Sequence, residues 1–268
     1  MSSSMQFPPI ATAIWHEEAE PDDPFSTRLA RCSGYDVFGE MLGQAHWADM
    51  LYLLFRGQAP SASQARLLES LAVALANPGP RDQSVHAAMC GGIGGSTSAS
   101  CLIAALAVGA GHLGGSREVF LAMESWQHCG CELTSWEAHL TQKPSDIASI
   151  WPAPQHPSGF EPHAIKARLP VLQTLAHLAE CSPGSRLSWL NEHRQQLETI
   201  AGFPLSLSGV AAAAFADLDL SPEQGEMLYL LLRLPGAAAH ALEQKQQSHK
   251  NFPFFALELQ NGTPEEEV

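Results

Sequence analysis

The residues best placed for chemistry lie in the last third of the chain, between Arg233 and Gln244. His240 follows Arg233 by seven positions, and Gly236 stands between them. If Pro235 only kinks a helix, this spacing places the arginine and the histidine two turns apart on one face. Gly236 then leaves room for a second backbone or a ligand to come close. The segment is therefore a candidate functional site.

Two of the 12 histidines stand in segments that also carry glycine. His86 comes before the run Gly91-Gly92-Ile93-Gly94-Gly95, and His163 follows residues 158–162. Imidazole is the usual acid, base or ligand near neutral pH, although most histidines have no such role. The glycine run has two readings: it presents backbone amides to an anion, or it is a connector that allows close helix packing.

The cysteines indicate reduced thiols rather than a metal centre. Cys129 and Cys131 have only Gly130 between them, whereas zinc sites prefer two or more intervening residues. We therefore predict no metal site. The first residues lack both a basic start and an apolar run, so no signal peptide is predicted and a cytoplasmic location is expected.

Charge and hydropathy exclude two classes of partner. The formal net charge is -14, from 28 acidic and 14 basic side chains, and this repels nucleic acid and anionic membrane surfaces. The longest weakly polar stretch, residues 99–113, is shorter than the roughly 20 residues of a membrane helix. With 45% hydrophobic residues the chain is expected to fold around a sizeable core.

These residues must be positioned mainly by helices, because β-branched and aromatic runs are rare. Capping signals at Ser61 and Ser221 open two apolar helical patterns, and short strands are predicted only near 10–14 and 28–31. Residues 160–202 could form a small domain between a large domain's first part (1–159) and its final part with the tail (203–268). Helices are predicted at 47–55, 61–75, 96–108, 117–126, 165–178, 186–200, 210–218 and 221–231.

From about residue 12 to 255 the sequence resembles the citrate synthase superfamily, and most closely its citryl-CoA lyase branch, which also forms the C-terminal module of ATP-citrate lyase. Four anchors carry the resemblance in order along the chain. They are residues 34–37 with 52–60; His86 with Gly111-His112-Leu113-Gly114-Gly115-Ser116; residues 159–163 with Ala167-Arg168; and residues 233–244.

The resemblance implies an all-α, citrate synthase-like fold with a small inserted helical domain. It also implies a homodimer, or a higher oligomer, whose sites borrow residues from the partner copy. The ligands would be a carboxylic acid and coenzyme A, the latter as a thioester substrate or product and with no tightly bound cofactor.

Site residues follow from the resemblance by position. His86 and His163 match the catalytic histidines that hold the oxyacid and polarise its reacting oxygen. Arg168 and Arg233 match the arginines that bind its carboxylates, for which a planar guanidinium is suited. Lys250 lies near the place of a basic residue that contacts coenzyme A.

The sequence departs from the family pattern at three places. Ser208 stands where the family has its catalytic Asp, and a serine hydroxyl is a poor general base near pH 7. Leu113 replaces a histidine of the synthases, a change that the lyase branch also tolerates. Glu161 and Pro162 precede His163, which fits the family histidine only after a shift of one residue. Glu161 is either a substitute acid or base, or a solvated loop residue.

The leading hypothesis is an enzyme, a carbon–carbon lyase that cleaves citryl-CoA or an analogue to oxaloacetate, or another 2-oxo acid, and an acyl-CoA. One alternative is a binding or regulatory protein that holds coenzyme A or a tricarboxylate without turnover. Another is a relative that acts on a different acid, with Ser208 in contact with the substrate.

Overall fold

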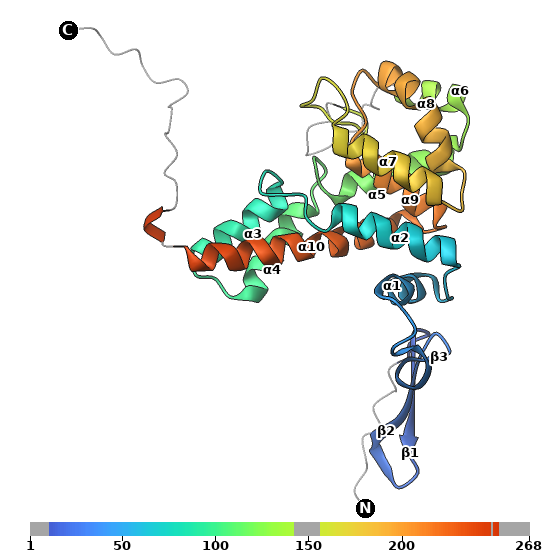
Figure 1. Cartoon of the computed structure of the whole chain (residues 1–268), viewed down its shortest axis with the longest axis vertical. Helices are drawn as coiled ribbons and strands as arrows, with labels where there is room; N and C mark the ends of the chain where they lie inside the picture. The colour runs from blue at the N-terminus through green and yellow to red at the C-terminus, as the bar shows by residue number, and fades with distance from the viewer. Residues whose placement is uncertain (1–10, 142–155, 248, 252–268) are drawn as a thin grey trace, which may run out of the picture.

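The structure is a computed structural model that describes residues 11–141, 156–247 and 249–251. Within these ranges the chain is mostly helical, with one small sheet near its N-terminal end (Figure 1), so the predicted helical class is confirmed. Its helices are α1 (Trp47–Arg56), α2 (Ala62–Leu75), α3 (Gln83–Ile93), α4 (Ser98–Gly109), α5 (Ser116–Cys129), α6 (Leu133–Thr141), α7 (Leu169–Cys181), α8 (Arg186–Ala201), α9 (Leu207–Asp217) and α10 (Pro222–Gln246), with a short π-helix η1 (Val37–Met41) and a 3-10 turn η2 (His249–Asn251).

Capping boxes explain where two of the helices begin. The hydroxyls of Ser61 and Ser221 accept hydrogen bonds from the N–H groups of Gln64 and Gln224, whose side chains in turn accept from the serine N–H groups. This exchange satisfies backbone donors that the first turn of a helix leaves unpaired. The predictions at the starts of α2 and α10 are therefore confirmed.

Helices α3 and α6 are not among the predicted ones. Asp82 begins α3 by accepting hydrogen bonds from the N–H groups of Ser84 and Val85, and the helix then runs through most of the glycine run. A Cβ at Gly92 would collide with the carbonyl oxygen of Ala241 in α10. Close helix packing is therefore the role that the structure gives this glycine.

The sheet is an antiparallel hairpin of β1 (Trp15–Glu20) and β2 (Asp23–Cys32), with β3 (Tyr35–Asp36) beside β2. It projects away from the helices (Figure 1). The second predicted strand lies within β2. The first is wrong: β1 starts only at Trp15, residues 11–14 are not in a strand, and Ile10 lies outside the described residues.

Helix α9 lies at the centre of the core. Residues 208–217 are all buried, and residues 211–214 are four alanines, which let the surrounding helices approach closely. Helices α2, α5, α7, α8 and α10 pack around it. At its end the buried Asp217 carboxylate accepts hydrogen bonds from the N–H groups of Arg186 and Leu187, and so caps the first turn of α8.

Helices α7 and α8 occupy the range 160–202, and they pack against α2, α6 and α9. The domain boundaries at 160 and 202 stay a prediction. Among the described residues, no helix has both the length and the apolar character needed to cross a membrane.

Helix α10 continues through Pro235 and contacts α2, α3, α4, α5 and α9 (Figure 1). At Gly236 it comes against the end of α2, where the Gly236 N–H donates a hydrogen bond to the carbonyl oxygen of Ala76 (2.7 Å). A Cβ at position 236 would lie 2.6 Å from that oxygen and 2.7 Å from Cα of Asn77. Of the two alternatives that the sequence leaves open for Gly236, a second backbone or a ligand, the structure shows the close backbone.

Replacing Gly236 with alanine tests this contact. Because the added methyl group meets backbone atoms that cannot rotate away, we expect Gly236→Ala to lower the free energy of unfolding by roughly 1–3 kcal/mol. Chemical denaturation measures the change. An increase in stability, such as the gain of up to about 1 kcal/mol that alanine normally gives over glycine within a helix, would contradict the close approach.

Candidate functional site

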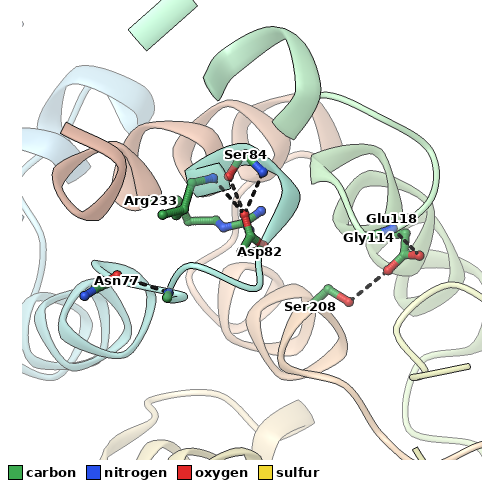
Figure 2. Close-up of polar contacts among 9 residues, drawn as sticks. Asn77, Asp82, Ser84, Gly114, Glu118, Ser208 and Arg233 are labelled. Atoms are coloured by element: carbon green, nitrogen blue, oxygen red, sulfur yellow. Dashed lines mark hydrogen bonds and ion pairs between the residues drawn. The ribbon is translucent and has the colours of Figure 1, made fainter. Parts of the chain in front are cut away.

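Arg233 and Asp82 form a buried ion pair between α10 and the start of α3 (Figure 2). Arg233 is 6% exposed, and its guanidinium lies over the ring of Tyr229, 4.8 Å from the ring centre. The other carboxylate oxygen of Asp82 accepts from the N–H (3.0 Å) and the hydroxyl (2.5 Å) of Ser84. The arginine expected to bind a substrate carboxylate is thus already paired with a carboxylate of the chain.

A second polar cluster surrounds Glu118, which is 5% exposed in the first turn of α5. Its Oε1 accepts from the N–H of Gly114 (3.0 Å) and lies 3.0 Å from Nε2 of the buried His156. Its Oε2 accepts from the hydroxyl of Ser208 (3.3 Å; Figure 2). Ser208 Oγ is in turn 2.6 Å from Oγ of Ser206, the N-cap residue of α9. A buried carboxylate therefore contacts the hydroxyl of Ser208, the residue that the sequence prediction aligns with the family Asp.

The double glycine before α5 sets the position of Glu118. Gly114 has a positive φ of 72°, a conformation that favours glycine, and its N–H points to the Glu118 carboxylate. A Cβ at Gly115 would collide with the backbone of Gly111, so this turn also needs a second glycine. The first turn of a helix favours a negative charge. Leu113, which the sequence prediction aligns with a histidine of the synthases, is exposed.

The segment that carries His163 is joined to the start of α9. Phe160 and Leu205 form an isolated antiparallel bridge, and the N–H of Ser206 donates to the carbonyl oxygen of Gly159 (3.0 Å). Gly159 has a φ of 90°, and a Cβ there would lie 3.1 Å from Cα of Gly209. These contacts bring the third sequence anchor next to Ser206 and Ser208.

Tyr229 of α10 connects the two polar clusters. Burial raises the pKa of its phenol; the Arg233 guanidinium opposes this shift, while the carboxylates of Asp82 and Glu118 add to it. The charges of both clusters therefore act on the same phenol. We call the two clusters together the polar region; helices α3, α5, α9 and α10 and the segment of His156 supply its residues.

Solved structures share this arrangement of helices. Citryl-CoA lyase from Hydrogenobacter thermophilus has a TM-score of 0.69 and 17% identity, over 96% of this chain and 98% of that one. ATP citrate lyase from Methanothrix soehngenii, in complex with citrate and coenzyme A, has a TM-score of 0.68 and 18% identity. A mutant of Methanosaeta concilii ATP citrate lyase, in complex with (3S)-citryl-CoA, has a TM-score of 0.69 and 16% identity. The chain has the fold of the citryl-CoA lyases.

The citrate synthase-like fold that the four sequence anchors predict is thereby confirmed. For both ATP citrate lyases the match covers 96% of this chain but only 43% of the other. The citryl-CoA lyase fold therefore corresponds to less than half of those longer proteins. No protein-family model matches the sequence, and a comparison with curated proteins finds no match.

Within the citryl-CoA lyase fold, four of the predicted site residues lie at the surface, and Lys250 is one of them. His86 is exposed in the first turns of α3, and its N–H donates to the carbonyl oxygen of Asp82. His163 and Arg168 are also exposed. Glu161 holds these two together, because it pairs with Arg168 (3.0 Å) and accepts a hydrogen bond from the N–H of His163 (3.2 Å).

Lys250, in η2, lies beyond the end of α10. Thirteen residues of helix separate Arg233 from the last residue of α10, a length of about 20 Å at 1.5 Å per residue. Lys250 therefore lies far from the polar region of its own chain.

Glu118 and His156 are the two residues that sequence reasoning missed. A signal for Glu118 was present: Ala122 and Trp126 follow it at helical intervals, and all three positions are buried. The spacing thus places a carboxylate on the apolar face of α5. His156 carries no comparable signal, because it lies in an irregular segment. Among the described residues, no three His, Cys, Asp or Glu side chains gather as a metal site.

Removing the Arg233 charge tests its structural pairing. Arg233→Gln leaves the partly buried Asp82 without its partner, so we expect a loss of about 3 kcal/mol in the free energy of unfolding, the lower end of the range for buried pairs. The matched control is Arg117→Gln, because Arg117 forms a partly exposed pair with Glu226 (3.4 Å). That control should cost about 1 kcal/mol or less. Equal losses for the two variants, measured by urea denaturation, would contradict a buried pair at Arg233.

Proposed function

We propose that the protein is a carbon–carbon lyase that cleaves citryl-CoA, or a related 3-hydroxy-acyl-CoA, into oxaloacetate or another 2-oxo acid and an acyl-CoA. The observation that carries this proposal is the match with citryl-CoA lyase along nearly the whole of both chains, 96% of this one and 98% of the other. The buried carboxylate at Ser208 adds support, because it offers an acid–base group where the family Asp is absent.

The proposed roles combine the sequence prediction with the geometry. His86 and His163 would stabilise charge on the substrate hydroxyl that becomes a ketone. Arg168 and Arg233 would bind carboxylates, and Lys250 would contact coenzyme A. A guanidinium has five N–H donors, so Arg233 can keep its bond to Asp82 while it binds a ligand.

A second candidate is a protein that binds coenzyme A or a tricarboxylate without turnover. Ser208 favours it, because the sequence prediction aligns this residue with the catalytic Asp of the family and a serine hydroxyl is a poor general base near pH 7. A relative that acts on a different acid is a third candidate.

We also propose that the protein is a homodimer whose sites combine residues of both copies. The distance of Lys250 from the polar region supports this, because in a dimer Lys250 can reach the partner's site. Helices α3, α4 and the C-terminal half of α10 extend away from the main body (Figure 1). This layer has a small core, while α4 and α10 leave apolar side chains exposed: Ile103, Val108, Leu231 and Leu242.

Analytical ultracentrifugation tests the dimer. The measured mass should be twice the 28.8 kDa of one chain, and the mass of a monomer would contradict the proposal.

A coupled assay tests cleavage. The protein is incubated with citryl-CoA, and any oxaloacetate is reduced by malate dehydrogenase, so that NADH absorbance falls. We expect His163→Ala to lower kcat about 10²–10⁴-fold, the usual contribution of an acid–base group. His177→Ala is the matched control, because His177 is an exposed imidazole on α7 that contacts Ser70. Tight coenzyme A binding by calorimetry without any oxaloacetate would contradict the lyase and leave the binding protein.

A further inference from the structure

Four side chains form a continuous hydrogen-bonded chain from the core to the start of α9. It runs from His156 through Glu118 and Ser208 to Ser206, with links of 3.0, 3.3 and 2.6 Å. The first three residues are buried, and Ser206 is half-buried. These hydrogen bonds therefore connect a buried carboxylate and a buried imidazole with the Ser206 hydroxyl, which solvent reaches.

The packing of α5 does not account for a carboxylate at this place. Val119, Ala122 and Met123 of the same helix are buried and apolar. Removing a carboxylate and an imidazole from water costs several kcal/mol per ion unless other groups compensate. Groups arranged in this way at the expense of stability are typical of functional sites.

The four side chains can keep their hydrogen bonds whether Glu118 is ionised or protonated. When Glu118 is ionised, Oε1 accepts from Gly114 and His156, and Oε2 accepts from Ser208. When Glu118 is protonated on Oε2, it donates to Ser208 Oγ, since a hydroxyl can accept as well as donate. Ser208 then directs its own proton to Ser206 or to a ligand. A proton can thus pass between Glu118 and Ser208 with only a rotation of the hydroxyl.

We propose that Glu118 supplies a proton through the Ser208 hydroxyl to the enolate formed in carbon–carbon cleavage. The inference rests on the proposed lyase function. Ser208 would be the catalytic residue, because it touches the substrate. Glu118 and His156 would be positioning residues that act through it. A serine hydroxyl alone is a weak acid, and the adjacent carboxyl group replaces the proton as it leaves.

The proposed step balances in protons and electrons. A base removes the proton of the substrate hydroxyl, and the electron pair of that O–H bond forms the carbonyl group of the 2-oxo acid. The carbon–carbon bond breaks, and its electron pair enters the thioester as an enolate. The enolate carbon takes the proton of Ser208 Oγ, which takes one from Glu118. The Glu118–His156 pair regains a proton from water, and the base releases the hydroxyl proton to water.

The groups around Glu118 decide how pH affects this step. His156 faces it from the segment before α7, Ser208 from α9, and Gly114 from the turn before α5. On α10, Tyr229 lies beside the Arg233–Asp82 pair, and the guanidinium is 4.8 Å from the centre of its ring. Because His156 bonds to the carboxylate that supplies the proton, the pH profile of kcat should change when His156 is replaced.

Exchange of the methyl hydrogens of acetyl-CoA with D₂O tests the proposal, because exchange requires the enolate and its reprotonation. Mass spectrometry measures the exchange, and the coupled assay measures cleavage, both in the full-length protein. We expect Glu118→Gln to lower exchange and kcat about 10²–10⁴-fold, with little change in KM. His156→Asn should shift the pH profile of kcat. The matched control is Glu124→Gln, an exposed glutamate on the same helix, which should stay within about twofold.

Ser208→Ala keeps the test decisive if Glu118→Gln does not fold. It removes only a hydroxyl, and Ser206 remains to cap α9. If either folded variant keeps the wild-type kcat and pH profile, the proton path is wrong and the lyase stands. If the wild type neither cleaves citryl-CoA nor exchanges hydrogens, both proposals fail. If the wild type exchanges hydrogens but does not cleave citryl-CoA, and Glu118→Gln loses the exchange, the proton path is supported. The substrate is then derived from an acid other than citrate.

Discussion

A carboxylate in the interior of a protein needs charge compensation and hydrogen bonds at both oxygens, and the arrangement around Glu118 follows from that requirement. The start of α5 supplies the Gly114 N–H and a favourable helix terminus, the segment before α7 supplies His156, and α9 supplies Ser208. The hydrogen bonds to the Glu118 carboxylate therefore hold together three segments that are far apart in sequence. The candidate site is the place where they meet.

Close backbone approaches make this meeting possible. Gly159 and Gly209 let the segment of His163 lie against the first turn of α9, and Gly236 lets α10 rest on the end of α2. A side chain at any of these positions would push the elements apart. Glycines that look like loop signals in the sequence are thus packing positions, and the polar groups depend on them for their distances.

The sequence predicts most of the helices and the fold, because apolar periodicity, capping residues and the four anchors are local or ordered signals. It predicts a helix at 210–218, whereas α9 begins three residues earlier, at Leu207, so that Ser208 lies in the first turn of the helix. It misses α3, because a run of glycines suggests a loop until α10 is seen to pack on it. It also misses Glu118 and His156, because their importance comes from contacts across 90 and 38 positions of the chain. No local pattern encodes such contacts.

The carboxylate that the resemblance expects at position 208 has a structural counterpart in the same core. Ser208 keeps a hydroxyl where the resemblance expects Asp, and Glu118 places a carboxylate behind it. A crystal structure of the protein with coenzyme A and citrate would test this most directly. We expect a ligand oxygen or the thioester carbon next to Ser208 Oγ, with Ser208 still bonded to Glu118. A ligand bound elsewhere, with Ser208 sealed in the core, would contradict it.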